Sequence, residues 1–155
     1  MDDLESSSIR GFAVQTTIKS VALTFVNVHL EPGKDGDFKR LQQFNDIKNN
    51  CPTPALLIAG DTNMRVAEEE ALEKIGIIGQ RPPTATWNSR INHFRDDGRE
   101  YTSYYTRYLH TDRVKVDQVV VHDKPVKEEG KQFFLSDHFA LSGRVEVLKG
   151  DSESE

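Results

Sequence analysis

Residues 56–65, LLIAGDTNMR, change character at a single glycine. Before Gly60 the run is apolar without a break, which predicts a short strand over 55–59 that is buried on both faces. After Gly60 a carboxylate, a hydroxyl, an amide and a guanidinium follow within five positions. Asp61 alone is explained equally well by an Asx turn that ends the strand. The stretch is therefore either a polar turn or the floor of an active site, and its neighbours decide between the two.

The surrounding segments predict an α/β chain ordered strand, strand, helix, strand, helix, long loop, strand, strand. Apolar residues at every third position predict the first helix, with Asp37 as its N-cap and an end near Asn50. Segment 84–112 is rich in aromatic and arginine residues and is predicted to be a long functional loop or a surface-binding segment, not a core element. The other predicted elements are a hairpin of strands 11–18 and 21–30, a short helix near 67–75, and strands 114–121 and 139–148.

The composition is typical of a globular chain with one domain. The 155 residues are 36% hydrophobic and 29% charged, which is enough for a single core. We expect the domain to cover 10–148, between a polar leader (1–9) and an acidic disordered tail (149–155). No apolar run approaches the roughly 20 residues of a membrane-spanning helix, so no membrane span is expected. The single Cys51 and the acidic start predict an intracellular protein of the nucleus or cytoplasm, with an organelle left open.

Polar side chains stand where four predicted strands end or turn. Taken singly, each has a structural explanation, such as a hydrogen-bonded histidine or a carboxylate that caps a turn. Their coincidence favours a site, because a polar group at a buried strand is costly unless it is paired or used. With a formal net charge of -5, a phosphate ligand would need such a local cluster and a metal ion. The residues are His29, Asp61 with Asn63, Asp117, and Asp137 with His138.

This set of residue types suits metal-assisted attack of water on a phosphodiester. Carboxylates bind hard cations such as Mg²⁺, and they also hold a histidine ring in one tautomer. Amide and imidazole groups donate hydrogen bonds to phosphate oxygens. A metal-bound or carboxylate-bound water then supplies the nucleophile.

Five motifs in order, VNVHLEPG, IAGDTNMR, TATWN, VDQVVV and LSDHFAL, resemble the later motifs of the endonuclease/exonuclease/phosphatase family, which includes deoxyribonuclease I. The resemblance is greatest to the tyrosyl-DNA phosphodiesterase 2 group and extends from about residue 10 to 148. It implies an α/β (α+β) fold that is the second half of a four-layer α/β/β/α sandwich. It also implies a Mg²⁺-dependent or Mn²⁺-dependent hydrolase whose substrate is a nucleic acid or a protein-DNA adduct, such as a 5′-phosphotyrosyl-DNA linkage.

The resemblance also implies a role for each motif residue. Asp61 would orient or deprotonate the attacking water, and Asp61 and Asp137 would lie at the metal. Asn63 and His29 would donate to the phosphate. His138 would stabilise the transition state, with its ring fixed by Asp117. The implied substrate contacts are Arg65 and Trp87, the latter suited to stacking on an aromatic group.

The family's first half supplies an asparagine and the main metal-binding glutamate, and neither has a counterpart in this sequence. Three explanations follow: the rest of the fold lies in cis or in a partner chain, the chain is an inactive remnant serving as a structural or binding subunit, or a local residue such as Glu31 completes the metal site. A phosphoinositide or nucleotide phosphatase is a further alternative, because phosphate-binding residues are shared among these enzymes.

Overall fold

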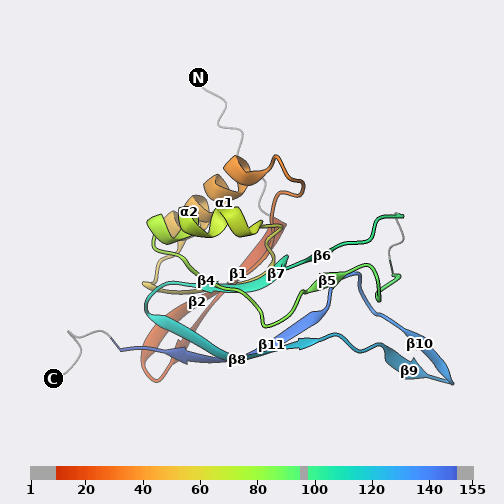
Figure 1. Cartoon of the computed structure of the whole chain (residues 1–155). Coiled ribbons are helices and arrows are strands. Elements are labelled where there is room, and N and C mark those ends of the chain that lie inside the picture. Colours follow the sequence, from red (N-terminus) through yellow and green to blue (C-terminus); the bar gives the residue numbers. More distant parts are fainter. Residues whose placement is uncertain (1–9, 95–97, 150–155) are drawn as a thin grey trace.

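A five-stranded mixed sheet forms the centre of the fold in the computed structural model, which describes residues 10–94 and 98–149. Its strands lie in the order β1-β2-β3-β7-β4. Helices α1 and α2 cover one face, and β8 and β11 lie across the other (Figure 1). The bounds of the sheet strands are β1 (Arg10–Ile18), β2 (Val21–His29), β3 (Ala55–Asp61), β7 (Thr106–His110) and β4 (Ile78–Gln80).

Strand β3 is buried on both faces, as its uninterrupted apolar sequence predicts. It pairs in parallel with β2 and antiparallel with β7. Successive side chains of a strand point to opposite faces, so Leu56 and Ile58 contribute to the core beneath the helices. Ala55 and Leu57 contribute to a second core between the sheets. Two cores thus share one strand, and Asp61 is the last residue of this strand, at its carboxyl end.

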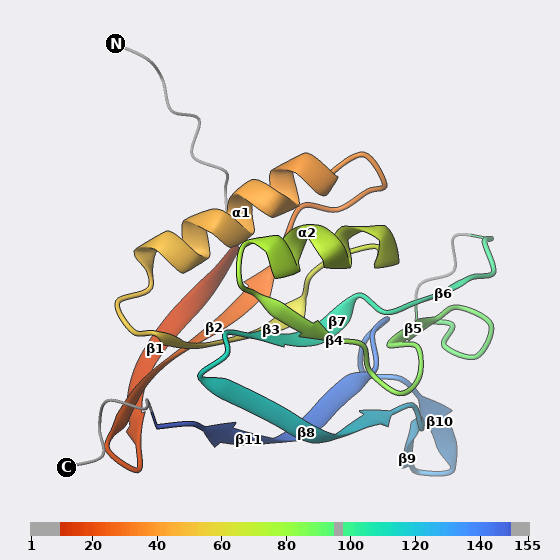
Figure 2. The ribbon, with the colours of Figure 1, turned by 60° about the vertical axis from the view of Figure 1, so that its left-hand side comes forward.

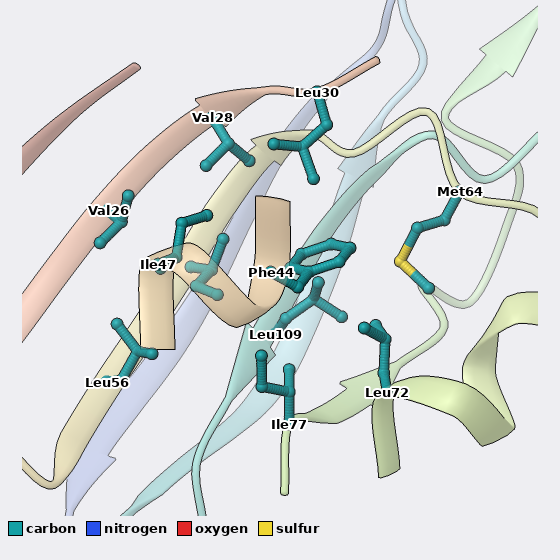
Figure 3. Packing of buried hydrophobic residues seen from close by; sticks show 11 residues of the cluster. Val26, Val28, Leu30, Phe44, Ile47, Leu56, Met64, Leu72, Ile77 and Leu109 are labelled. Carbon is teal, nitrogen blue, oxygen red and sulfur yellow. The ribbon is translucent and has the colours of Figure 1, made fainter. Parts of the chain in front are cut away.

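The helical layer consists of α1 (Asp37–Asn50), a 3-10 turn η1 (Val66–Glu68) and α2 (Glu69–Lys74). Phe44, Ile47 and Leu72 point from the helices towards the sheet and pack on Val28 and Leu109 among others (Figure 3). The first helix lies where the periodicity places it. The prediction of Asp37 as N-cap is wrong, because Gly36 occupies that position and no side chain caps the helix.

The second sheet layer pairs β8 (Val114–His122) with β11 (Ala140–Val147) beneath the central sheet, as Figure 2 shows. Val114, Val116 and Val147 pack there against Leu23 and Leu57. The described chain therefore has a helical layer, a five-stranded sheet and a two-stranded sheet of β8 and β11 beneath it.

The prediction that 84–112 is one long loop is wrong. This segment contains β5 (Trp87–Asn88) and β6 (Thr102–Ser103), which pair with each other, and then β7. Strand β7 lies inside the central sheet, between β3 and β4. The sequence also did not reveal β4 or the small hairpin of β9 (Val126–Glu128) and β10 (Lys131–Phe133).

The predicted leader and all of the predicted tail except Lys149 lie outside the described residues. Within residues 10–94 and 98–149, neither helix is long and apolar enough to cross a membrane.

Candidate active site

Strand register brings three polar residues together at one edge of the central sheet. His29 lies opposite Asp61 in the parallel pair of β2 and β3. Asp61 in turn lies opposite Thr106, the first residue of β7. Parallel strands end at the same sheet edge and an antiparallel neighbour begins there, so three adjacent strands present their side chains side by side.

A cavity of about 600 Å³ opens over this edge. Its walls come from three strand ends, the turn after β2, the turn after β3, β5 and the turn before β11. The lining residues are His29, Pro32, Gly33, Asp61, Asn63, Arg65, Trp87, Arg99, Tyr101, Tyr105, Thr106, Ser136, Asp137 and His138. Seven of the eight residues that the sequence analysis proposed as site residues therefore line one cavity, and Asp117 does not.

Asp61 lies between two histidines. Its Oδ2 atom is 3.5 Å from His29 Nε2 and 3.4 Å from His138 Nε2. Its other oxygen, Oδ1, accepts a hydrogen bond of 3.0 Å from the backbone N–H of Asn63. The Asx turn and the active-site floor are thus not alternatives, because one carboxylate oxygen makes the turn and the other faces the cavity.

The ring of His138 is oriented by Thr106 and Trp87. Its Nδ1 atom is 2.9 Å from Thr106 Oγ1, and the Trp87 ring meets it edge-on with centroids 5.0 Å apart. When Nε2 carries the proton towards Asp61, Nδ1 accepts from the Thr106 hydroxyl, and this arrangement selects one tautomer. The expectation that Asp117 fixes this ring is therefore not met, since a threonine occupies the position at Nδ1.

Asp117 lies within β8, outside the cavity. Its Oδ1 atom is buried and, among the described residues, has no hydrogen-bond partner, while Oδ2 is 3.7 Å from Lys115 Nζ. The pairing with β11 shifts register beside it, between Ser142 and Arg144.

Asn63 and Arg65 form the floor and one rim of the cavity. Asn63 is buried, adopts a left-handed backbone with φ of 50°, and donates from Nδ2 to the Leu30 carbonyl. Asparagine tolerates this conformation better than most residues. Arg65 donates to the Asn63 carbonyl and lies 4.7 Å above the centre of the Tyr105 ring. The guanidinium is thereby held at the cavity by a hydrogen bond and a cation–π contact.

Aromatic rings form the part of the cavity wall beside His138. Trp87 is buried and stacks on Tyr101 with centroids 5.8 Å apart, and Tyr105 meets it edge-on. Among the described residues, the Trp87 Nε1–H is buried without an acceptor. Trp87 is a predicted site residue, whereas no motif of the sequence points to Tyr101, Tyr105 or Thr106 as lining residues. Only the aromatic composition of segment 84–112 pointed towards the first two.

The residues present do not by themselves fit a Mg²⁺ ion. Among the residues that the structure describes, Asp61 and Asp137 are the only carboxylates on the cavity wall, and the oxygens of Asp61 already contact Asn63 and the two histidines. No group of three or more candidate ligands occurs in the described part of the chain. The carboxylate of Glu31 meets Lys39 instead, 3.5 Å away, and lies outside the cavity lining. A cation that prefers six oxygen ligands would need donors from elsewhere.

Comparison with solved structures identifies the fold. No protein-family model and no curated protein matches the sequence. D. rerio TDP2 complexed with a single strand DNA product is 21% identical, with a TM-score of 0.68 over 87% of this chain and 60% of that chain. Truncated Caenorhabditis elegans TDP2 is 17% identical, with a TM-score of 0.65 over 92% of this chain and 61% of that one.

An endonuclease/exonuclease/phosphatase family protein from Leptotrichia buccalis is also similar, at 15% identity and a TM-score of 0.60 over 87% of this chain and 53% of that chain. The chain therefore has the endonuclease/exonuclease/phosphatase fold, and the predicted fold class is confirmed. It spans less than two thirds of each of these structures, in agreement with the expected half of the sandwich.

Proposed function

We propose that this chain supplies the phosphate-binding and water-activating face of a phosphodiester hydrolase. The observation that supports it is the Asp61 carboxylate, held within 3.5 Å of His29 Nε2 and 3.4 Å of His138 Nε2 on the wall of a cavity. A carboxylate between two imidazole donors is suited to accept a proton from water while the donors hold the oxygens of a phosphate.

In this mechanism a phosphodiester lies over Asp61. Asp61 orients a water molecule and accepts its proton as the water oxygen bonds to phosphorus. In the free site the Nε2 atoms of His29 and His138 face Asp61. When the phosphate is bound, their N–H groups donate instead to the non-bridging oxygens, where negative charge increases in the transition state. The phosphorus–oxygen bond to the leaving group then breaks, and the leaving oxygen takes up a proton from solvent. Thr106 keeps the His138 ring turned towards the reacting phosphate.

The aromatic wall favours a substrate with a ring next to the phosphate, as in a nucleic acid or a 5′-phosphotyrosyl-DNA adduct. The half-buried Tyr101 ring, which the buried Trp87 supports by stacking on it, offers ring surface to the cavity. Stacking of a base on such a ring contributes about 1–3 kcal/mol. Arg65 at the rim pairs with a further phosphate. The similarity to a TDP2 complexed with a single strand DNA product supports the same substrate class.

Metal dependence is part of the proposal and requires the remainder of the fold. Mg²⁺ or Mn²⁺ would neutralise phosphate charge, and Asp61 and Asp137 are the residues of this chain that would face it. The missing carboxylate would come from a complementary half, in cis or in a partner chain. The intracellular location stays a prediction.

The test joins the chain to a complementary half and measures Mg²⁺-dependent release of tyrosine from a 5′-tyrosyl oligonucleotide. Asp61→Asn should abolish turnover, because the amide cannot accept the proton of water. Asp112→Asn is the matched control, since Asp112 is exposed and lies outside the cavity lining. Inactivity of the complete, folded assembly on this and other phosphodiesters would overturn the proposal.

A non-catalytic subunit of a larger assembly is the second candidate. It is favoured by exposed apolar residues on β1, where Phe12 is 60% and Val14 49% exposed, together with the incomplete set of metal donors. In that case Asp61→Asn would leave assembly unchanged. Added Mg²⁺ would also leave the melting temperature of the assembly unchanged, whereas Mg²⁺ binding at a catalytic site would raise it.

A further inference from the structure

Two consecutive glutamates stand where η1 ends and α2 begins. The sequence explains Glu68 and Glu69 as ordinary charges of a helix N-terminus, where acidic residues are favourable. In the structure each of them binds an arginine that is almost completely buried, and the two arginines come from different elements. Arg40 lies on α1 and is 0% exposed, and Arg107 lies on β7 and is 1% exposed.

Glu68 holds the turn that follows β2 through Arg40. Both oxygens of Glu68 accept from this guanidinium, at 2.8 Å from Nε and 2.7 Å from Nη2. The remaining nitrogen, Nη1, donates to the carbonyls of Glu31 and Gly33, and Gly33 lines the cavity. Glu68 Oε1 also accepts the backbone N–H of Arg65 at 2.8 Å. One carboxylate thus fixes both the turn beside His29 and the backbone of the rim arginine.

Glu69 holds the part of the cavity wall at the start of β7 through Arg107. Its Oε1 atom accepts from Arg107 Nη1 at 2.6 Å, and Arg107 Nε donates to the Tyr104 carbonyl at 2.6 Å. Tyr104 and Arg107 bracket the two residues that face the cavity from this side, Tyr105 and Thr106. Arg81 also donates to both oxygens of Glu69. The hydrogen bond from Arg81, reinforced by Arg107, keeps the pKa of the Glu69 carboxyl below its usual range.

Burying an arginine is costly unless every donor finds a partner, and a cheaper apolar contact often stabilises a fold as well. These two ion pairs instead hold short segments at the cavity. Arg40 donates to the turn at Glu31 and Gly33, and Arg107 donates to the carbonyl of Tyr104, which precedes the lining residue Tyr105. We propose, on the basis of the proposed function, that Glu68 and Glu69 are positioning residues. They set the distance between the two parts of the cavity wall that they hold, and thereby the affinity with which His29, Arg65 and His138 bind a phosphate.

The test uses Trp87, the single tryptophan of the chain, as a fluorescent reporter of inorganic phosphate binding. The variants are Glu68→Gln and Glu69→Gln, and the control is Glu70→Gln, an exposed neighbour paired with Lys74. We expect the Kd for phosphate to rise by about tenfold in the first two, at a temperature where each is folded, and to stay unchanged in the control. Lower melting temperatures with unchanged Kd would overturn the proposal, because they would assign these ion pairs to stability alone.

A second readout does not depend on phosphate. NMR ring resonances of Tyr105 should move in Glu68→Gln, through Arg65, and those of His138 should move in Glu69→Gln, through Thr106. If the unmodified chain does not bind phosphate, this result counts against the proposed function. The ring resonances of the two variants still test whether Glu68 and Glu69 position the cavity residues. Unchanged ring resonances in both variants would contradict it.

Discussion

At the scale of single residues, the partner of His138 differs from the one that the motifs implied. The sequence shows that a carboxylate lies in a strand, but not which strand lies next to the histidine. Thr106 reaches His138 because β7 pairs with β3, and this pairing joins residues far apart in the sequence. A polar residue that ends an apolar run, such as Asp61, can be recognised as a candidate site residue from the neighbouring sequence alone. Thr106 cannot be recognised in this way, because its contact with His138 depends on the pairing of two strands that are distant in sequence.

Replacing Thr106 by valine tests this role, because it keeps the shape of the side chain and removes the hydroxyl. The Nδ1 atom of His138 loses its partner, so the ring is free to turn away from Asp61. We expect a several-fold weaker Kd for inorganic phosphate and a loss of stability of about 1 kcal/mol. Thr17→Val on the exposed strand β1 is the control. Equal phosphate affinity of Thr106→Val and the unmodified chain would refute the role.

At the scale of elements, the close approach of β2 and β3 depends on Gly60. Its backbone has φ of 131°, and a Cβ atom at this position would lie 2.2 Å from the Val28 carbonyl oxygen. The obstacle is backbone, which cannot turn aside as a side chain can. Because His29 and Asp61 follow directly after Val28 and Gly60 in this register, the glycine also sets the spacing of two site residues.

Gly60→Ala should therefore destabilise the chain by about 3 kcal/mol or more, by combining a backbone clash with an unfavourable φ. The measurement is urea unfolding at equilibrium. Gly130→Ala is the matched control, since Gly130 also has positive φ, 77°, but no atom lies within 4 Å of its added Cβ. The control should cost only about 1 kcal/mol. Similar losses in the two variants would show that conformational strain, and not contact with Val28, limits this position.

The same scale explains which elements the sequence could predict. Residues 55–59 form an unbroken apolar run, and the period of α1 is readable, so both were expected. Strand β7 reads TRYLH, and its buried Arg107 donates from Nη1 to Glu69 and from Nε to the Tyr104 carbonyl. A strand that carries a paired, buried arginine looks like a surface segment until its partner is known. For this reason the sequence of 84–112 by itself predicts a loop.

At the scale of the whole molecule, one apolar face is left uncovered on β1. Val14 lies opposite Phe25, and Phe25 opposite Leu57, so the three side chains stand in one row on one face. Leu57 is covered by β8 and β11 in the core between the sheets, whereas Phe12 and Val14 remain exposed. The second sheet thus covers only part of the first.

This face predicts how the isolated chain behaves. Phe12 and Val14 are already exposed in the folded chain, so replacing both by threonine should leave the melting temperature almost unchanged. Self-association at high concentration should fall, because an exposed apolar strand face is a site of association. Sedimentation velocity over a range of concentrations measures it. Phe38→Ser, 68% exposed on the helical layer, is the control and should not alter association. A marked drop in melting temperature for the double variant would mean that β1 packs within the chain, and that no complementary half is needed to cover it.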